Sequence, residues 1–356
     1  MKAEYAGKGH CGRTSVFPGH LGFSGRTRVV LGTMWKKASG RYSLIVLVIW
    51  ALVSLISRFW TPVPVWATDG YRIWQTPNSA HLLGTDGTGA DILSWLMAGS
   101  ATNLVISLLS VLLSGVLGLG LVMAMVSRHS GFSQAVVVLV DALISLPTVL
   151  LALILAVPLG PSMAVVIVAC GIGYGLNLAR IVRPQALLVA GSDYVQSARH
   201  SGVGSVRIFF THLVPNIVPV LCVQLSMSAG TSVLAESGLT YLGVGVPSGL
   251  PSWGHSLSTS VRFIDIFPLT VVWPGLVVTM VVVALNLFGD ALRDAIDPVT
   301  NPGLRAAVAS ANRPLHRSRS WEAPEGYVHA DSTPRPAVHD GRADHSSQGG
   351  CDVAED

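Results

Sequence analysis

The sequence has 356 residues, of which 50% are hydrophobic and 12% are charged. Because soluble domains carry about 25% charged residues, this composition indicates an integral membrane protein and excludes an ordinary soluble domain. The net charge is only +4, and the four cysteines show no CxxC or other metal-ligand spacing. A disulfide framework and a cysteine metal site are therefore not expected, and Cys170 and Cys222 are expected to pack within apolar helices.

The N-terminal residues 1–42 contain scattered lysines and arginines, many glycines and no early apolar core. They are a poor signal peptide, and we expect them to form a mobile basic arm in the cytoplasm. A first transmembrane helix is expected within residues 43–60, and an extracytoplasmic segment within residues 61–103. The tail at 299–356 is polar, with many prolines, serines and histidines, and is expected to be disordered and cytoplasmic.

Six apolar runs are long enough to cross a membrane. A spanning helix needs about 20 mostly apolar residues, and its backbone polar groups must bond within the helix because lipid offers them no partner. The six expected spans are Ser43–Phe59, Leu104–Val126, Ala135–Val157, Ser162–Ala179, Leu213–Val233 and Leu269–Phe288. The last five spans belong to a helical core at residues 104–298.

Two of these runs contain residues that disturb a helix. Pro147 and Pro158 interrupt or end the third run, and we expect a packed bend there, with a kink that shapes a pathway as the alternative. The fourth run contains Gly171, Gly173 and Gly175. Glycines in membrane helices let a neighbouring helix approach closely, and we favour that role over a hinge.

Lysines and arginines are concentrated on one side of the expected spans. If the N-terminus is cytoplasmic, only Arg58, Arg72 and Arg262 fall outside. The cations that then flank the spans on the inner side include Lys36, Lys37, Arg41, Arg128, Arg180, Arg183, Arg199, Arg207 and Arg293. Because cytoplasmic loops carry an excess of these residues, this bias places both termini in the cytoplasm.

A polar, glycine-broken stretch, Asp193–Asn216, separates the fourth and fifth runs and faces the cytoplasm in this orientation. Ser192 is a candidate cap for a short helix at its start. Gly202 suits the left-handed position just past the end of that helix, and Ser205 is a candidate cap for a second helix at Val206–Leu213. The pattern alone fits either a solvated loop or a helix–turn–helix elbow that receives force from a cytoplasmic partner.

This stretch resembles the EAA loop of ABC importer permeases. The motif reads Glu-Ala-Ala, three residues, Gly, nine residues, then a hydrophobic or His position and a nearby Pro. The matching positions are Gln196, Ser197, Ala198, Gly202, His212 and Pro215. In that family the loop sits in a cleft on the ATPase subunit, so the resemblance implies an ATPase-coupling elbow at residues 184–215. Gln196 replaces the usual Glu and Ser197 replaces an Ala, which leaves altered coupling and a degenerate subunit open.

Four further segments resemble the C-type subunits of the dipeptide, oligopeptide and nickel branch of these importers. Gly84–Ser100 looks like the branch's GTDxxGRDxxSRxxxG stretch, although Ala90 and Trp95 stand where that branch usually has Arg. The other segments are Ala179–Gln185, which resembles ARxVRxQ, Ala235–Gly254, which resembles AExxLSFLGLGV…PSWG, and Trp273–Pro298, which resembles a final span with an NLxGDxLRDxLDP ending. The likeness covers about residues 80 to 300, with the motifs in the branch's order.

The resemblance implies an all-α integral membrane protein of about six transmembrane helices, with the type I ABC importer permease fold, in the bacterial cytoplasmic (inner) membrane. The implied partners are a second permease subunit, two cytoplasmic ABC ATPase subunits, an extracytoplasmic substrate-binding protein and membrane lipid, with no nucleic acid. Di- or oligopeptides are the implied substrates, and nickel or another small solute is the alternative.

The sequence offers no enzymatic site. HExxH, GxSxG, paired-carboxylate and Walker A patterns are absent, so we expect no cofactor or metal, and ATP hydrolysis is assigned to separate subunits. An ion-coupled secondary transporter is a second hypothesis, but it predicts charges deep within several spans, whereas the charges here cluster at span ends. A membrane interaction protein without transport is a third hypothesis.

Ionisable residues in or near the spans are candidates for a structural or pathway role, and they are Asp141, Arg180, Arg183 and Glu236. Asp141 lies near the cytoplasmic end of its run, where it either reaches the interface or pairs with Arg180. Glu236 lies at the outer end of the fifth run, where contact with the binding protein or substrate and simple solvation are both open. Beyond the last run, Arg293 and Asp297 are spaced to pair on one helix face. The residues that contact substrate are not identified.

Overall fold

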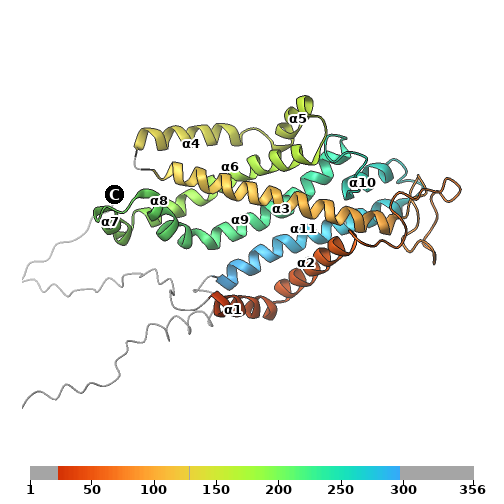
Figure 1. The fold of residues 1–356 in the computed structure, drawn as a ribbon, viewed down its shortest axis with the longest axis horizontal. Helices are drawn as coiled ribbons and strands as arrows, with labels where there is room; N and C mark the ends of the chain where they lie inside the picture. The colour runs from red at the N-terminus through yellow and green to blue at the C-terminus, as the bar shows by residue number, and fades with distance from the viewer. Residues whose placement is uncertain (1–22, 128, 297–356) are drawn as a thin grey trace, which may run out of the picture. The chain divides into compact units, whose positions relative to one another are not determined.

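The computed structural model describes residues 23–127 and 129–296. Apart from an isolated β-bridge between Thr85 and Asp91, the regular structure in these ranges is helical (Figure 1). In chain order the helices are α1 (Phe23–Lys36), α2 (Ala38–Ile56), α3 (Ile92–Met125), α4 (Ser130–Ile144), α5 (Thr148–Leu159), α6 (Met163–Ala190), α7 (Asp193–His200), α8 (Ser205–Ile208), the π-helix η1 (Phe209–Leu213), α9 (Val214–Tyr241), α10 (Trp253–Val261) and α11 (Pro268–Ile296). The predicted all-α class is confirmed.

Five helical stretches are long and apolar enough to cross a membrane, namely α2, α3, α6, α11 and the stretch from α8 through α9. A sixth crossing needs α4 and α5 together, and these are bent by 83° at their junction. The third predicted span is therefore two helices with a sharp bend between them, not one helix. Pro147 explains the break, because proline lacks an N–H and disfavours helical backbone at the residue before it. The residues of the bend, 145–147, are exposed, so the packed bend predicted here is wrong, and Pro158 lies inside α5.

The helices around the outer segment also differ from the expected boundaries. α2 begins at Ala38 and ends at Ile56, and α3 begins at Ile92, well before the predicted Leu104. Asp91 explains this early start, because its Oδ2 accepts hydrogen bonds from Ser94 N at 2.9 Å and from Ser94 Oγ at 2.7 Å. Such a cap satisfies backbone donors at a helix start, so the apolar run alone underestimates the helix.

The second half of the predicted arm is helical. α1 packs on the end of α11, where Met34 lies against Ala291 and Ala295. Lys37, between α1 and α2, forms an ion pair with Asp294 at 2.6 Å. Residues 1–22 of the arm and the tail 299–356 lie outside the described residues, as does Asp297 with its expected pairing to Arg293.

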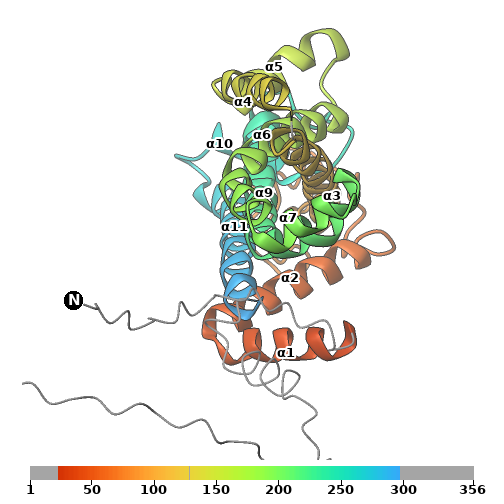
Figure 2. The ribbon, with the colours of Figure 1, turned by 90° about the vertical axis from the view of Figure 1, so that its left-hand side faces the viewer.

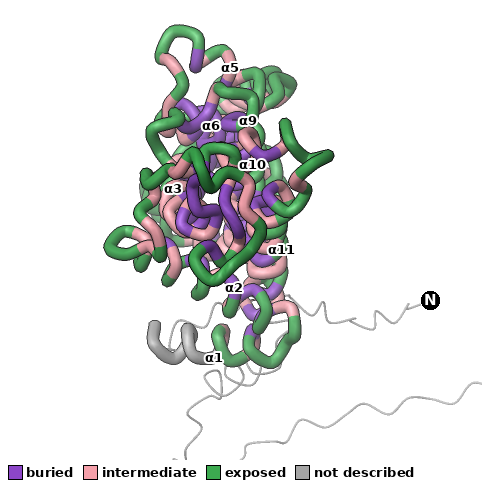
Figure 3. The backbone as a smooth tube through the Cα atoms, turned by 90° about the vertical axis from the view of Figure 1, so that its right-hand side faces the viewer, coloured by how far each residue is buried: buried purple, intermediate pink, exposed green. Residues whose placement is uncertain are grey.

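The core lies where α3, α6, α9 and α11 pack along one another (Figure 2). Buried residues are concentrated in the middle of this bundle, whereas α5 has many exposed residues (Figure 3). Close packing depends on the predicted glycines, since a Cβ on Gly171 would lie 2.5 Å from Leu113 Cδ2, and one on Gly173 would lie 2.7 Å from Thr148 Oγ1. A Cβ on Gly175 would lie 3.2 Å from the Ser114 carbonyl oxygen. The predicted role in close helix approach is confirmed at all three glycines.

A valine at Gly118 should destabilise the contact between α3 and α6. A Cβ on Gly118 would collide with Leu178 Cδ2 and lie 3.0 Å from the Gly175 carbonyl oxygen. Overpacking of this kind costs about 1–3 kcal/mol, so Gly118→Val should lower the melting temperature of the purified subunit. Gly120→Val is the matched control in the same helix, because nothing lies within 4 Å of its Cβ position. Equal melting temperatures for the two variants would contradict this packing.

Candidate functional site

The predicted elbow is present between α6 and α9, at the end of the bundle where α7 and α8 lie (Figure 1). α7 ends at His200, and Gly202 follows with φ +78°. Val203 N donates to the Ala198 carbonyl at 3.2 Å, and Gly202 N donates to the Arg199 carbonyl at 3.1 Å. These bonds pair the last carbonyls of α7 and turn the chain into α8. The predicted left-handed conformation of Gly202 is confirmed.

The predicted serine caps of the elbow are wrong. Ser192 occupies the residue before α7, but its hydroxyl donates to the Val189 carbonyl at 2.6 Å and caps nothing in α7. Gly204, not Ser205, precedes the second helix. That helix is also not regular, because α8 passes into the π-helix η1 before α9. Pro215 lies just beyond this widened turn and cannot donate to a carbonyl four residues earlier, which accounts for the irregular winding.

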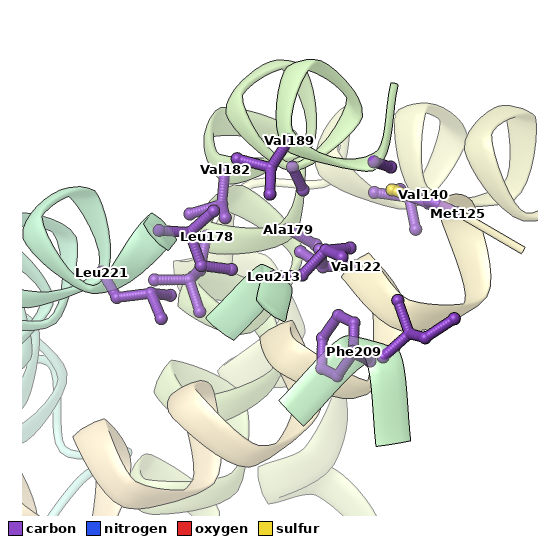
Figure 4. Packing of buried hydrophobic residues seen from close by; sticks show 14 of the residues in the cluster. Val122, Met125, Val140, Leu178, Ala179, Val182, Val189, Phe209, Leu213 and Leu221 are labelled. Atoms are coloured by element: carbon purple, nitrogen blue, oxygen red, sulfur yellow. The ribbon is translucent and has the colours of Figure 1, made fainter. Parts of the chain in front are cut away.

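The inner side of the elbow is part of the largest buried apolar cluster among the described residues. Val195 of α7 is fully buried, and Ala198 packs beside it. Phe209 and Leu213 of η1 belong to the same cluster, together with Val122 of α3 (Figure 4). The apolar contact therefore runs without interruption from the elbow into α3, α6 and α9. A displacement of the elbow has to move these helices or break the contact, because packed interiors deform little.

Tyr194 and His212 link the two arms of the elbow. Their rings meet edge to face at 6.0 Å. Asn216 Nδ2 lies 3.3 Å from the Tyr194 hydroxyl and donates to the His212 carbonyl at 2.6 Å. His212 thus lies at the joint between α7 and α9, and Pro215 lies at the start of α9.

The outer side of the elbow is open. Gln196 and Ser197 are exposed, and Gln196 Nε2 donates to the Gly191 carbonyl at 3.0 Å, so its amide end is held against the chain. A hollow of about 390 Å³ is lined by Ala190, Gly191, Gln196, Arg199 and His200. Val206 of α8 and Phe210 of η1 are 59% and 58% exposed. The elbow therefore presents a basic hollow and two apolar side chains away from the bundle.

The predicted pairing of Asp141 with Arg180 is confirmed. Asp141 Oδ1 of α4 lies 3.7 Å from Arg180 Nη1 of α6, and the two side chains are 50% and 60% exposed. Arg183, one turn further along α6, has a buried Nε without a hydrogen-bond partner among the described residues. The structure therefore brings Asp141 and Arg180 together on an open face and leaves Arg183 apart from them.

Glu236 differs most from its predicted surroundings. Glu236 is 0% exposed. Contrary to both expectations from the sequence, its carboxylate is therefore neither solvated at the membrane interface nor placed to contact a binding protein or substrate. Its carboxylate accepts hydrogen bonds from Thr240 Oγ1 at 2.9 Å and from Ser237 Oγ at 3.2 Å. The Ser252 side chain, just before α10, also bonds to it. Glu236 therefore fastens the outer end of α9 to the start of α10 from inside the protein.

Trp253 follows Ser252 and is the largest fully buried side chain of the described residues. Its Nε1 donates to the Leu96 carbonyl of α3 at 2.9 Å, and its ring lies 5.9 Å from the ring of Trp50 on α2. The sequence carried a signal for this anchor in its PSWG segment, but residue patterns do not show which helices a tryptophan joins. Trp253 connects α10 with α2 and α3.

The two departures from the arginine pattern of the outer segment have structural reasons. Ala90 is 0% exposed, so no room for a solvated cation exists at that position. Trp95 stacks on His255 of α10 with ring centroids 5.7 Å apart, and Trp66 meets its edge. Burial lowers the pKa of His255 below its ordinary value, although the Asp86 carboxylate opposes the change. Burial thus favours the neutral ring of His255, which suits the aromatic stack.

No group of three or more metal-ligating side chains occurs among residues 23–127 and 129–296. Residues 116–301 match the family described as the binding-protein-dependent transport system inner membrane component. The chain belongs to this family. It is thus a multi-pass permease component of a bacterial membrane transport complex with other ABC subunits, and it is not itself an enzyme.

Relatives of this family member cover most of its length. A putative peptide transport system permease protein of Brucella suis is 34% identical over 279 residues, which are 77% of this chain and 93% of the relative. The nickel transport system permease protein NikC of Escherichia coli K12 is 34% identical over 75% of this chain and 96% of its own length. The dipeptide transport system permease protein DppC of Alkalihalophilus pseudofirmus is 30% identical over 72% of this chain and 84% of its own length.

Proposed function

We propose that this permease imports di- or oligopeptides and that ATP hydrolysis in partner subunits drives the import. The relatives named for peptide and dipeptide transport support this substrate class. Nickel is the second candidate, because a relative of equal identity is named for nickel transport. In the proposed complex the chain pairs with a second permease subunit, and an extracytoplasmic binding protein delivers the substrate.

The proposed complex contains two cytoplasmic ATPase subunits, and the elbow of this chain is the proposed contact with one of them. Gln196, Ser197, Ala198 and Gly202 are the proposed contact region, with His212 and Pro215 at the joint to α9. The observation that carries this assignment is the two-sided elbow, with Val195 fully buried in the bundle core and Gln196 exposed beside a basic hollow. Closure of the ATPases around ATP would move α7, and the shared core would pass that movement to α3, α6 and α9. The pathway then alternates between inward-open and outward-open packing.

Uptake by the complete reconstituted importer tests this function. The chain is purified with the permease, ATPase and binding-protein subunits encoded beside it and placed in liposomes loaded with ATP. We expect uptake of a radiolabelled tripeptide that needs both ATP and the binding protein. Uptake of Ni²⁺ with no uptake of the peptide would replace the peptide assignment with the nickel one. Uptake driven by an ion gradient without ATP would contradict the mechanism.

A further inference from the structure

An exposed polar strip crosses two membrane helices on one side of the subunit. It consists of Gln134 and Asp141 of α4, Ser145 just beyond the end of α4, and Asn177 and Arg180 of α6, and all five residues are exposed. The ion pair between Asp141 and Arg180 joins its two halves. Polar side chains in a membrane helix are costly against lipid, so this strip needs an occupant other than acyl chains.

α4 has three distinct faces, and the strip is one of them. At 3.6 residues per turn, Gln134, Asp141 and Ser145 fall within about 40° of one another. A second face packs on the core through Val136, Val137, Val140 and Ile144. A third face exposes the apolar residues Phe132, Leu139 and Leu143. The exposed side chain of Val138 also lies on the polar face, between Gln134 and Asp141 in the sequence, so this face is mixed. Lipid suits the third face, and the polar side chains of the mixed face are left for water or protein.

The strip continues along α6 to the break between α4 and α5. Asn177 Nδ2 donates to the Gly173 carbonyl at 2.9 Å. Thr148, the first residue of α5, lies against Gly173. The exposed bend at residues 145–147 thus lies beside the same stretch of α6. An exposed polar bend in the membrane suits a hydrated solute or protein better than lipid, because irregular backbone is tolerated there only where it is buried in protein or lines a water-filled cavity.

Asp141 and Arg180 form a long ion pair and not a hydrogen bond. Their closest atoms are 3.7 Å apart, beyond the 2.7–3.2 Å typical of a hydrogen bond. The two side chains also make no hydrogen bond within the part of the chain that the structure describes. Each lies about 15 Å along its helix from the elbow end, by the rise of about 1.5 Å per residue. The pair therefore keeps a free carboxylate oxygen and free guanidinium donors on this face of the helices.

We propose that the polar strip lines the substrate path and that Asp141 and Arg180 bind the two charged ends of a free peptide. The Asp141 carboxylate takes the N-terminal ammonium, and the Arg180 guanidinium takes the C-terminal carboxylate. A guanidinium presents paired N–H donors that match a carboxylate. A zwitterionic peptide that inserts here replaces one long ion pair by two short ones and adds no net charge. This inference rests on the proposed peptide import.

Peptides with blocked ends test the two assignments separately. In the reconstituted importer, Arg180→Gln should reduce uptake of a free tripeptide about tenfold or more, the effect of losing one charge-assisted contact. Uptake of the same peptide with a C-terminal amide should not change between parent and variant. Asp141→Asn should show the same pattern with an N-acetylated peptide. Each comparison is the ratio of uptake by the variant to uptake by the parent for the same peptide. The preference of the binding protein for that peptide therefore affects both values equally.

The control is Arg72→Gln, which breaks an exposed ion pair of similar type with Asp69 outside the strip. The relative uptake of free, amidated and acetylated peptides by the Arg72→Gln variant should equal that of the parent. If Arg180→Gln lowers the uptake of free and of blocked peptides equally, the ion pair has only a structural role and the proposal is overturned. Unchanged uptake of free peptide in both strip variants would also overturn it.

A second measurement does not depend on the substrate. With the four natural cysteines replaced by alanine, Ser145→Cys and Asn177→Cys should react with a hydrophilic thiol reagent in the assembled complex, whereas Leu143→Cys on the apolar face of α4 should not. Labelling of Leu143→Cys alone would overturn the strip as a water-lined path. Labelling as expected in a complex that imports no peptide would instead reject the proposed peptide substrate and leave the path intact.

Discussion

A valine at Gly202 should uncouple ATP use from transport. Gly202 has φ +78°, and a left-handed backbone costs a residue with a side chain about 1–2 kcal/mol, most for a β-branched one. The turn between α7 and α8 would then leave the geometry that positions the elbow. We expect Gly202→Val to lower ATP-dependent uptake about tenfold or more in the reconstituted importer.

The surroundings of Gly202 allow a loss of uptake in the valine variant to be assigned to the left-handed backbone. Nothing lies within 4 Å of its Cβ position, so crowding inside the subunit does not contribute. Gly202→Asn should lose less activity than the valine variant, because asparagine tolerates the left-handed region. The melting temperature of the membrane subunits should stay close to that of the parent in both variants. Equal activity of the valine and asparagine variants would show that the left-handed turn has no part in coupling.

Removal of the Trp253 ring should give the largest loss of stability. The side chain is 1% exposed, and it connects α10 with α2 and α3 through the ring of Trp50 and the Leu96 carbonyl. Large-to-small changes at buried tryptophans cost about 3–5 kcal/mol, since they leave a cavity. Trp253→Ala should therefore lower the melting temperature of the purified permease strongly, as measured by thermal unfolding in detergent.

The matched control for this change is Trp60→Ala. Trp60 lies just beyond α2 and is 61% exposed, and exposed substitutions usually change stability by less than about 0.5 kcal/mol. A melting temperature for Trp253→Ala as high as that of Trp60→Ala would mean that α10 is not anchored through this ring.

The helical class, the spans and the elbow follow from the sequence because each leaves a local pattern. Apolar length marks the spans, and a glycine at a helix end marks the turn at Gly202. Helix boundaries were missed where a polar residue extends a helix beyond its apolar run, as Asp91 does for α3. The break at Pro147 was foreseen as a bend, but its exposure depends on the packing of α4 and α5, which no local pattern specifies.

Among the candidate pathway residues, some features could likewise be predicted from the sequence and others could not. The pairing of Asp141 with Arg180 could be inferred, because two opposite charges at similar depths in neighbouring spans attract each other. The burial of Glu236 could not, since its position at a span end does not reveal that α10 folds back over it. Trp253 was recognised only as part of a motif, because its role comes from partners more than 150 residues away.

The central claim is that the elbow receives the movement of a cytoplasmic ATPase. A photo-cross-linking amino acid at Ser197, an exposed position on the outer side of α7, tests it most directly in the assembled importer. The account predicts a cross-link to an ATPase subunit whose yield changes when ATP replaces ADP. A cross-link from Ser197 to the extracytoplasmic binding protein would place the elbow on the wrong side of the membrane and contradict the account.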